Sequence, residues 1–165
     1  MADFPTPGIV FKDITPLLAD GSALRRAIDG LALGVEDMGI EVDVVAAIEA
    51  RGFIVGAALA VRLGLGMVPV RKPGKLPWAT EAEEYALEYG TDRLEVHRDA
   101  FEPGDRVLVV DDVIATGGTA AATGRLVERL GGELVGFAFL VELAFLDGRA
   151  ALPALPTTSL IAYDD

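Results

Sequence analysis

Two hydrophobic patterns alternate along the chain. Short apolar runs rich in β-branched residues predict buried strands, and they cover residues 42–48, 67–70, 106–110 and 134–141. Apolar residues spaced three and four apart predict helices between them, over 22–35, 52–63 and about 118–130. Strands that alternate with helices indicate right-handed crossovers. We therefore predict an α/β fold: a mostly parallel, twisted, doubly wound sheet flanked by helices.

Local signals refine three of these elements. Ser22 precedes the stripe of Leu24, Ile28, Leu31 and Val35 and is expected to cap that helix. The helix 52–63 is apolar nearly all round, so it should be buried on most sides. Pro69 cannot donate to a strand ladder and favours an edge position for the strand 67–70.

The middle of the chain breaks the alternation. Residues 73–83 show neither a helical nor a strand period, whereas 85–89 and 94–97 predict two strands around a turn at 90–93. A small hairpin is therefore expected as an appendage to the sheet. His97, the only histidine, is expected on its surface.

Composition narrows the function classes. The length of 165 residues fits a single domain, 1–165. A net charge of −12 argues against nucleic-acid binding, which depends on Lys and Arg. The absence of cysteine excludes disulfides, zinc–cysteine sites and a thiol nucleophile. No apolar run approaches the roughly 18 residues of a membrane span, and no secretory signal opens the chain, so we expect a cytoplasmic protein.

The strongest chemical signal follows the strand 106–110. Asp111 and Asp112 come directly after it, and Thr116-Gly117-Gly118-Thr119 opens the next helix. Ligands of open α/β sheets bind at the carboxyl ends of strands, and the free N–H groups of a helix start suit a phosphate. Paired carboxylates suit a ribose diol or the neighbourhood of a metal ion. The segment therefore predicts a sugar phosphate site; the alternative is an ordinary turn with two solvated aspartates.

The segment 109–119 (VVDDVIATGGT) resembles the PRPP (5-phosphoribosyl-1-pyrophosphate) signature of the type I phosphoribosyltransferases. Four further blocks are similar, in order, to the adenine phosphoribosyltransferase family: 3–15 (DFPTPGIVFKDIT), 49–53 (EARGF), 70–77 (VRKPGKLP) and 87–95 (LEYGTDRLE). Together they cover nearly the whole chain. The resemblance implies that adenine and PRPP give AMP and pyrophosphate with Mg²⁺, held mainly through PRPP rather than by direct protein ligands.

The resemblance also implies roles for residues around the donor. The 5′-phosphate would lie on Ala115, Thr116, Gly117, Gly118 and Thr119, and the ribose hydroxyls would face Asp111 and Asp112. Pyrophosphate would be bound by Arg51, Gly52, Arg71, Lys72 and Lys75. A non-proline cis peptide is expected at Glu49–Ala50. Because the arginine matching Arg71 can reach a neighbouring subunit's site in the family, a homodimer is expected; a surface ion pair is the alternative role for Arg51.

The base and the catalytic step carry further implied residues. Val10, Phe11 and Lys12 would form the adenine pocket, with Phe11 stacked on the ring unless it is a core residue. Glu88 would move a proton at the base from a mobile lid, within about 73–99, that closes over the site. Residues 1–20 would form a short hood, since only three residues precede Phe4 where family members carry a helix.

Two other functions remain open from the sequence. The first is transfer to another base, such as xanthine, guanine or orotate. Lys12 is the one side chain in 10–13 that can be assigned as a donor to a carbonyl-bearing base. The second is a PRPP-sensing regulator without catalysis, although such regulators usually add a basic face or a second domain. Substrate comparison separates the first from adenine transfer, and binding without AMP formation would favour the second.

Overall fold

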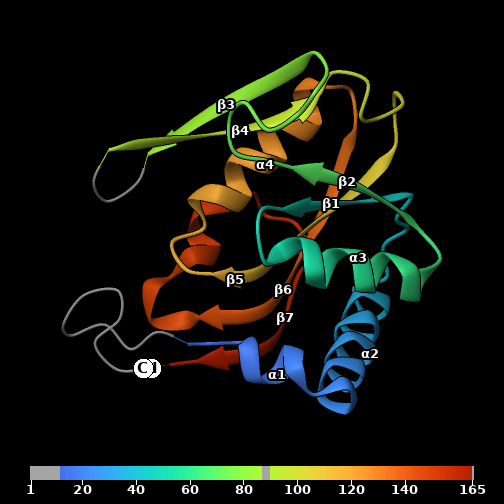
Figure 1. Cartoon of the computed structure of the whole chain (residues 1–165), viewed down its shortest axis with the longest axis vertical. Helices are drawn as coiled ribbons and strands as arrows, with labels where there is room; N and C mark the ends of the chain where they lie inside the picture. Colours follow the sequence, from blue (N-terminus) through green and yellow to red (C-terminus); the bar gives the residue numbers. More distant parts are fainter. Residues whose placement is uncertain (1–11, 87–89, 165) are drawn as a thin grey trace.

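A computed structural model describes residues 12–86 and 90–164. Its centre is a five-stranded sheet in the order β2-β1-β5-β6-β7, in which all neighbouring strands are parallel (Figure 1). The strands are β1 (Val44–Ile48), β2 (Gly66–Val70), β5 (Arg106–Ile114), β6 (Glu133–Leu143) and β7 (Thr157–Tyr163). The predicted parallel α/β sheet is confirmed, and β2 with Pro69 lies at its edge.

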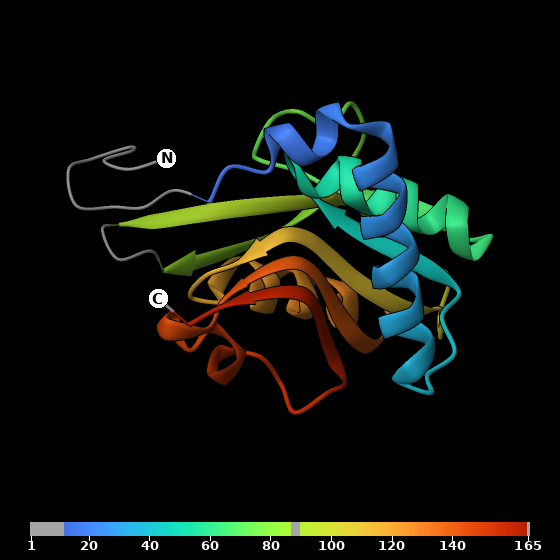
Figure 2. The ribbon, with the colours of Figure 1, turned by 90° about the horizontal axis from the view of Figure 1, so that it is seen from below.

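Helices cover both faces of this sheet. One face carries α1 (Thr15–Ala19), α2 (Gly21–Asp37) and α3 (Gly52–Leu63), and the other carries α4 (Gly118–Arg129), as Figures 1 and 2 show. Successive residues of a strand point to opposite faces. Val45 and Ala47 accordingly pack under α2 and α3, while Ala46 and Ile48 pack on the side of α4.

The predicted hairpin is present, but its first strand starts earlier than expected. β3 (Thr80–Ala86) pairs antiparallel with β4 (Thr91–His97). The hairpin buries Tyr85, Leu94 and Val96 in the core on the α4 side. Residues 80–83 gave no strand pattern because an acidic residue, Glu83, stands at a position that faces the rest of the protein, where an apolar residue would be expected. Two arginines of α4, Arg125 and Arg129, hold its carboxylate there.

Other sequence predictions need correction. Asp20, not Ser22, caps α2, and its carboxylate accepts hydrogen bonds from the N–H groups of Ser22 and Ala23 at 2.8 and 2.9 Å. α3 is not buried on most sides, since Val61 is 82% exposed on the face turned away from the sheet. β7 was missed because its Thr and Ser residues dilute the apolar pattern of an edge strand.

Two short 3₁₀ helices, η1 (Ala144–Leu146) and η2 (Gly148–Ala151), link β6 to β7 and were not predicted. Among the described residues, no helix has the length and apolar character that a bilayer crossing needs.

Candidate functional site

The two aspartates lie within a strand rather than after it. β5 continues to Ile114, and Asp111 is in register with Phe139 of β6. The expectation that the strand ends at residue 110 is therefore wrong. Pairing with β6 continues past the acidic residues because polar side chains at a strand's carboxyl end do not disturb the backbone ladder.

Asp111 and Asp112 sit in unequal environments. Burial, reinforced by the charge of Asp112, raises the pKa of Asp111 well above its usual range. Asp111 Oδ1 accepts a hydrogen bond from the Asp112 N–H at 2.8 Å. Asp112 is buried, and its Oδ2 lies 2.8 Å from Arg51 Nε as an ion pair while accepting no hydrogen bond from the described residues. The pair thus offers carboxylate oxygens to a ligand with hydroxyl groups.

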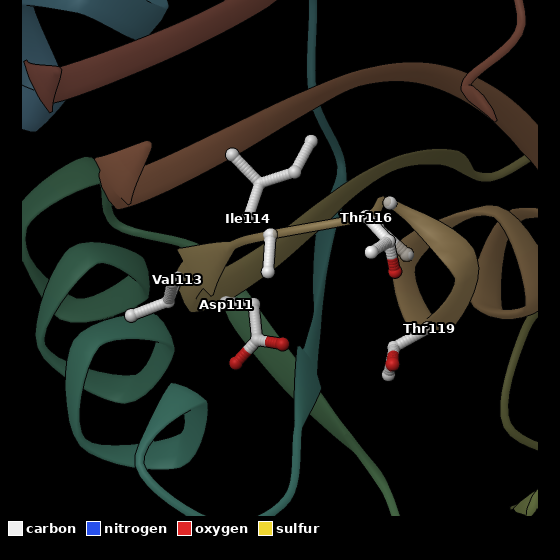
Figure 3. Close-up of a pocket in the computed structure, with 8 residues that line it drawn as sticks. Asp111, Val113, Ile114, Thr116 and Thr119 are labelled. Atoms are coloured by element: carbon white, nitrogen blue, oxygen red, sulfur yellow. The ribbon is translucent and has the colours of Figure 1, made fainter. Parts of the chain in front are cut away.

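The loop after β5 forms one wall of a pocket at the start of α4. Gly117 adopts a left-handed conformation with φ 78°, and no side chain caps the helix N-terminus. The pocket has a volume of about 80 Å³, and its lining residues are Asp111, Val113, Ile114, Ala115, Thr116, Gly117, Thr119 and Ala120. Figure 3 shows Asp111, Thr116 and Thr119 around it. Backbone donors at an uncapped helix start favour an anion here.

Most of the residues predicted from the signature line this pocket. Asp111 and four of the five loop residues line it, whereas Asp112 and Gly118 do not. A phosphate group on the loop and a diol at Asp111 can therefore belong to one ligand.

The loop after β1 lies against the same aspartate. The Glu49–Ala50 peptide is cis, as predicted. Gly52 begins α3, and a Cβ at this position would lie 2.5 Å from Asp111 Oδ1 and 3.2 Å from Asp111 Cα. Only a glycine lets the start of α3 approach β5 this closely. The predicted pyrophosphate loop and the predicted ribose site are therefore neighbours.

Glu49 organises the predicted basic cluster, a role that the sequence reading missed. Its side chain is 10% exposed. It accepts a hydrogen bond from the Lys72 N–H at 2.9 Å, lies 3.4 Å from Arg71 Nε, and contacts Lys75 Nζ. Burial acts to raise the pKa of Glu49, but the hydrogen bonds from Lys75 and Lys72 outweigh it, and the pKa is lowered.

A sequence signal for this cluster existed. Glu49 follows β1 directly and Arg71 follows β2 directly, and these strands pair in parallel with Ile48 opposite Val70. Residues that follow neighbouring parallel strands meet at one edge of the sheet.

Lys72 differs from the other two basic residues. Its ammonium group contacts Asp92 and lies 3.1 Å from Tyr85 Oη, so it binds the hairpin. Burial lowers the pKa of Lys72, but the hydrogen bonds to Asp92 and Tyr85 outweigh it, so the pKa is raised. The backbone of Arg71 is also bridged to Glu95 of β4 in both directions, at 2.9 and 2.7 Å. The basic segment is thus bound to both Glu49 and the hairpin.

The remaining predicted residues lie mostly outside the described part of the chain. Glu88, Val10 and Phe11 belong to the segments 87–89 and 1–11, which the structure does not describe. Lys12 is half-buried, with Nζ 4.0 Å from the centre of the Tyr163 ring. His97 is half-buried rather than a surface residue, and its Nε2 is buried.

Comparison with known proteins identifies relatives over nearly the full length of the chain. A family profile for the phosphoribosyl transferase domain matches residues 17–152. An adenine phosphoribosyltransferase of Synechococcus sp. (strain JA-3-3Ab) is 60% identical over 99% of this chain and 93% of the relative. The crystal structure of adenine phosphoribosyltransferase from Thermoanaerobacter pseudethanolicus ATCC 33223 aligns with a TM-score of 0.95 at 55% identity, over 99% of this chain and 94% of that one.

The adenine phosphoribosyltransferase of Saccharomyces cerevisiae, crystallised with adenine and an imino-altritol bisphosphate, aligns with a TM-score of 0.92 at 41% identity, over 97% of this chain and 92% of that one. Both the sequence and the fold thus match over nearly full length. The chain belongs to the phosphoribosyl transferase domain family, among the adenine phosphoribosyltransferases.

Proposed function

We propose that this chain transfers the 5-phosphoribosyl group of PRPP to adenine, which yields AMP and pyrophosphate. The observation that carries the proposal is the pocket at the end of β5, where Asp111 and the glycine loop line one cavity beside the start of α3. Relatives with 55–60% identity over nearly the whole chain bear the name of this enzyme.

The donor's groups can be assigned to the three loops. The loop 115–119 binds the 5′-phosphate through its N–H groups and the hydroxyls of Thr116 and Thr119. Asp111 and Asp112 accept hydrogen bonds from the ribose hydroxyls. The loop 49–52, with Arg51 and Gly52, and the cations Arg71, Lys72 and Lys75 bind pyrophosphate. In the structure Lys72 contacts Asp92, so its part in this binding requires that it exchange Asp92 for phosphate oxygens.

In the catalytic step the C1–pyrophosphate bond breaks and pyrophosphate leaves, while N9 of adenine forms the new bond to C1 and loses its proton. Positive charge develops on the ribose ring, and the carboxyl groups of Asp111 and Asp112 lie beside the proposed ribose position. We assign Glu88 to proton movement at the base, and Val10, Phe11 and Lys12 to adenine. A lid within the segment 73–99 that closes over the site would exclude water from the positively charged ribose ring.

We propose that Mg²⁺ is held chiefly by the substrate. Among the described residues, no group of three or more His, Asp or Glu side chains could hold a metal ion. Two adjacent carboxylates remain at Asp111 and Asp112 to bind the hydroxyls of a chelated donor. When bound, the ion would neutralise pyrophosphate and make it a better leaving group. We also propose that the enzyme acts as a cytoplasmic homodimer.

The proposal is tested by incubating the chain with adenine, PRPP and Mg²⁺ and following AMP by chromatography. Parallel reactions contain hypoxanthine, guanine, xanthine or orotate in place of adenine, and one reaction contains EDTA. We expect a nucleotide product only in the reaction that contains adenine, and we expect EDTA to abolish it. Product from another base would reassign the acceptor, and PRPP binding without any product would identify a sensor.

A further inference from the structure

A segment outside the signature packs against the back of the phosphate loop. A Cβ on Gly148 would lie 2.2 Å from the carbonyl oxygen of Ala115, and a Cβ on Gly117 would lie 2.1 Å from the carbonyl oxygen of Gly148. Both obstacles are backbone atoms, which cannot rotate away. The two segments, 115–117 and 144–151, therefore touch backbone to backbone, with a glycine on each side.

This segment, residues 144–151, is itself firmly attached to the sheet. Arg149 pairs with Glu142 of β6 through two contacts, Nε to Oε1 at 2.7 Å and Nη2 to Oε2 at 2.6 Å. Its Nη1 also donates to the carbonyl oxygen of Thr157 in β7 at 3.1 Å. The Glu142 side chain is 13% exposed, so this fork is shielded from water on the carboxylate side.

The geometry points to a support: residues 144–151, through Gly148 and the Arg149–Glu142 fork, hold the loop 115–117 in the shape that binds the 5′-phosphate. Gly148 and Arg149 are positioning residues, since they contact the loop or its support and not the pocket. A glycine-rich loop loses much conformational freedom when it binds a ligand. A rigid backbone contact behind it removes part of that loss before the substrate arrives.

The inference rests on the proposed function, because it assigns the loop 115–119 to a phosphate. The test uses the whole chain and measures the Kd of ribose 5-phosphate by calorimetry, together with KM for PRPP, KM for adenine and kcat. Gly148→Ala is compared with Gly21→Ala, a matched control because a Cβ on Gly21 meets nothing within 4 Å. We expect Gly148→Ala to raise the Kd of ribose 5-phosphate and KM for PRPP about 10- to 100-fold, which corresponds to the loss of one hydrogen bond to the charged phosphate group. KM for adenine should be unchanged.

Arg149→Gln keeps the inference testable if Gly148→Ala does not fold, with Arg62→Gln as control for the loss of the exposed Arg62–Asp29 pair. We expect a rise in the same two constants, and no rise for the control. A wild-type chain that binds no ribose 5-phosphate would overturn the phosphate assignment itself. A second outcome is a wild-type chain that binds ribose 5-phosphate while folded Gly148→Ala, or Arg149→Gln if Gly148→Ala does not fold, shows unchanged Kd and KM values. That result would overturn the supporting role of residues 144–151 and leave the phosphate assignment intact. A variant with lower kcat but unchanged KM and Kd would show a merely structural role and would also overturn it.

Discussion

The contact between Gly52 and Asp111 allows a substitution to be followed from geometry to affinity. Gly52→Ala would place its Cβ 2.5 Å from Asp111 Oδ1, about 0.9 Å closer than the 3.4 Å at which ordinary contact begins. Two structural features hold Asp111 in place and so hinder removal of this clash. Asp111 Oδ1 accepts the 2.8 Å hydrogen bond from the Asp112 N–H, and the Asp111 backbone is paired with β6.

The clash can be removed in two ways, and each costs free energy. If the start of α3 moves, overpacking costs about 1–3 kcal/mol, which lowers the unfolding midpoint by about 2–4 °C per kcal/mol for a chain of this length. If the carboxylate of Asp111 rotates instead, a hydrogen bond to a charged group is lost, worth about 1.5–3 kcal/mol. The same rotation removes the carboxylate from the ribose, and KM for PRPP rises about 10- to 100-fold.

Both routes can be measured with thermal unfolding and steady-state kinetics. Gly66→Ala is the control, since a Cβ on Gly66 meets nothing within 4 Å. Both routes lower the unfolding midpoint, whereas only rotation of the Asp111 carboxylate also raises KM for PRPP, so the two measurements together show which group moves. A Gly52→Ala protein that matches Gly66→Ala in both midpoint and KM would refute the reasoning.

Three further substitutions test the charges of the site. The pKa of Asp111 is raised from 3.8 by burial and by Asp112, so the folded state binds the extra proton and loses stability as pH rises above 3.8. Asp111→Asn should therefore raise the unfolding midpoint at pH 7 and not at about pH 3, while weakening PRPP binding; an equal gap at both pH values would contradict this. Glu49→Gln removes an ionised partner of Arg71 and Lys75 and should cost about 1 kcal/mol in urea unfolding at pH 7, and an unchanged midpoint would disprove it. Glu88→Gln should lower kcat about 100-fold or more with KM for PRPP retained, and near-normal turnover would end that assignment.

The sequence predicted what depends on local pattern. The parallel sheet, the bounds of α3 and the edge position of β2 follow from periodicity and from Pro69, because burial of apolar residues fixes strands and helices wherever the pattern is strong. The cis peptide at Glu49–Ala50 is confirmed as well, although it came from a resemblance and not from any local rule. The acidic run of β3 gave no such pattern, since Arg125 and Arg129, distant in sequence, determine that Glu83 can face protein.

The site was predicted less completely than the fold, for a related reason. Motifs identify the groups that would touch a ligand, but not the groups that hold those groups in place. Glu49 binds the basic cluster only because β1 and β2 end at one edge, and Gly148 reaches Ala115 only because β6 and β5 are neighbours. Each contact depends on strand order, which cannot be read from a single sequence.

Strand order also explains why three separate loops can bind one extended donor. β2, β1 and β5 are consecutive in the sheet, and their carboxyl ends carry the basic segment 71–75, the loop 49–52 and the loop 115–119. Neighbouring strands lie about 4.8 Å apart, so β2 and β5 are separated by about 10 Å, comparable to a sugar with phosphate groups at both ends. Acidic residues beside two of the three loops, Glu49 and the Asp111–Asp112 pair, offset part of the positive charge of Arg51, Arg71 and Lys75 before the substrate arrives. An anionic donor must then displace fixed carboxylate contacts, which favours a ligand that engages all three loops at once over a single free phosphate.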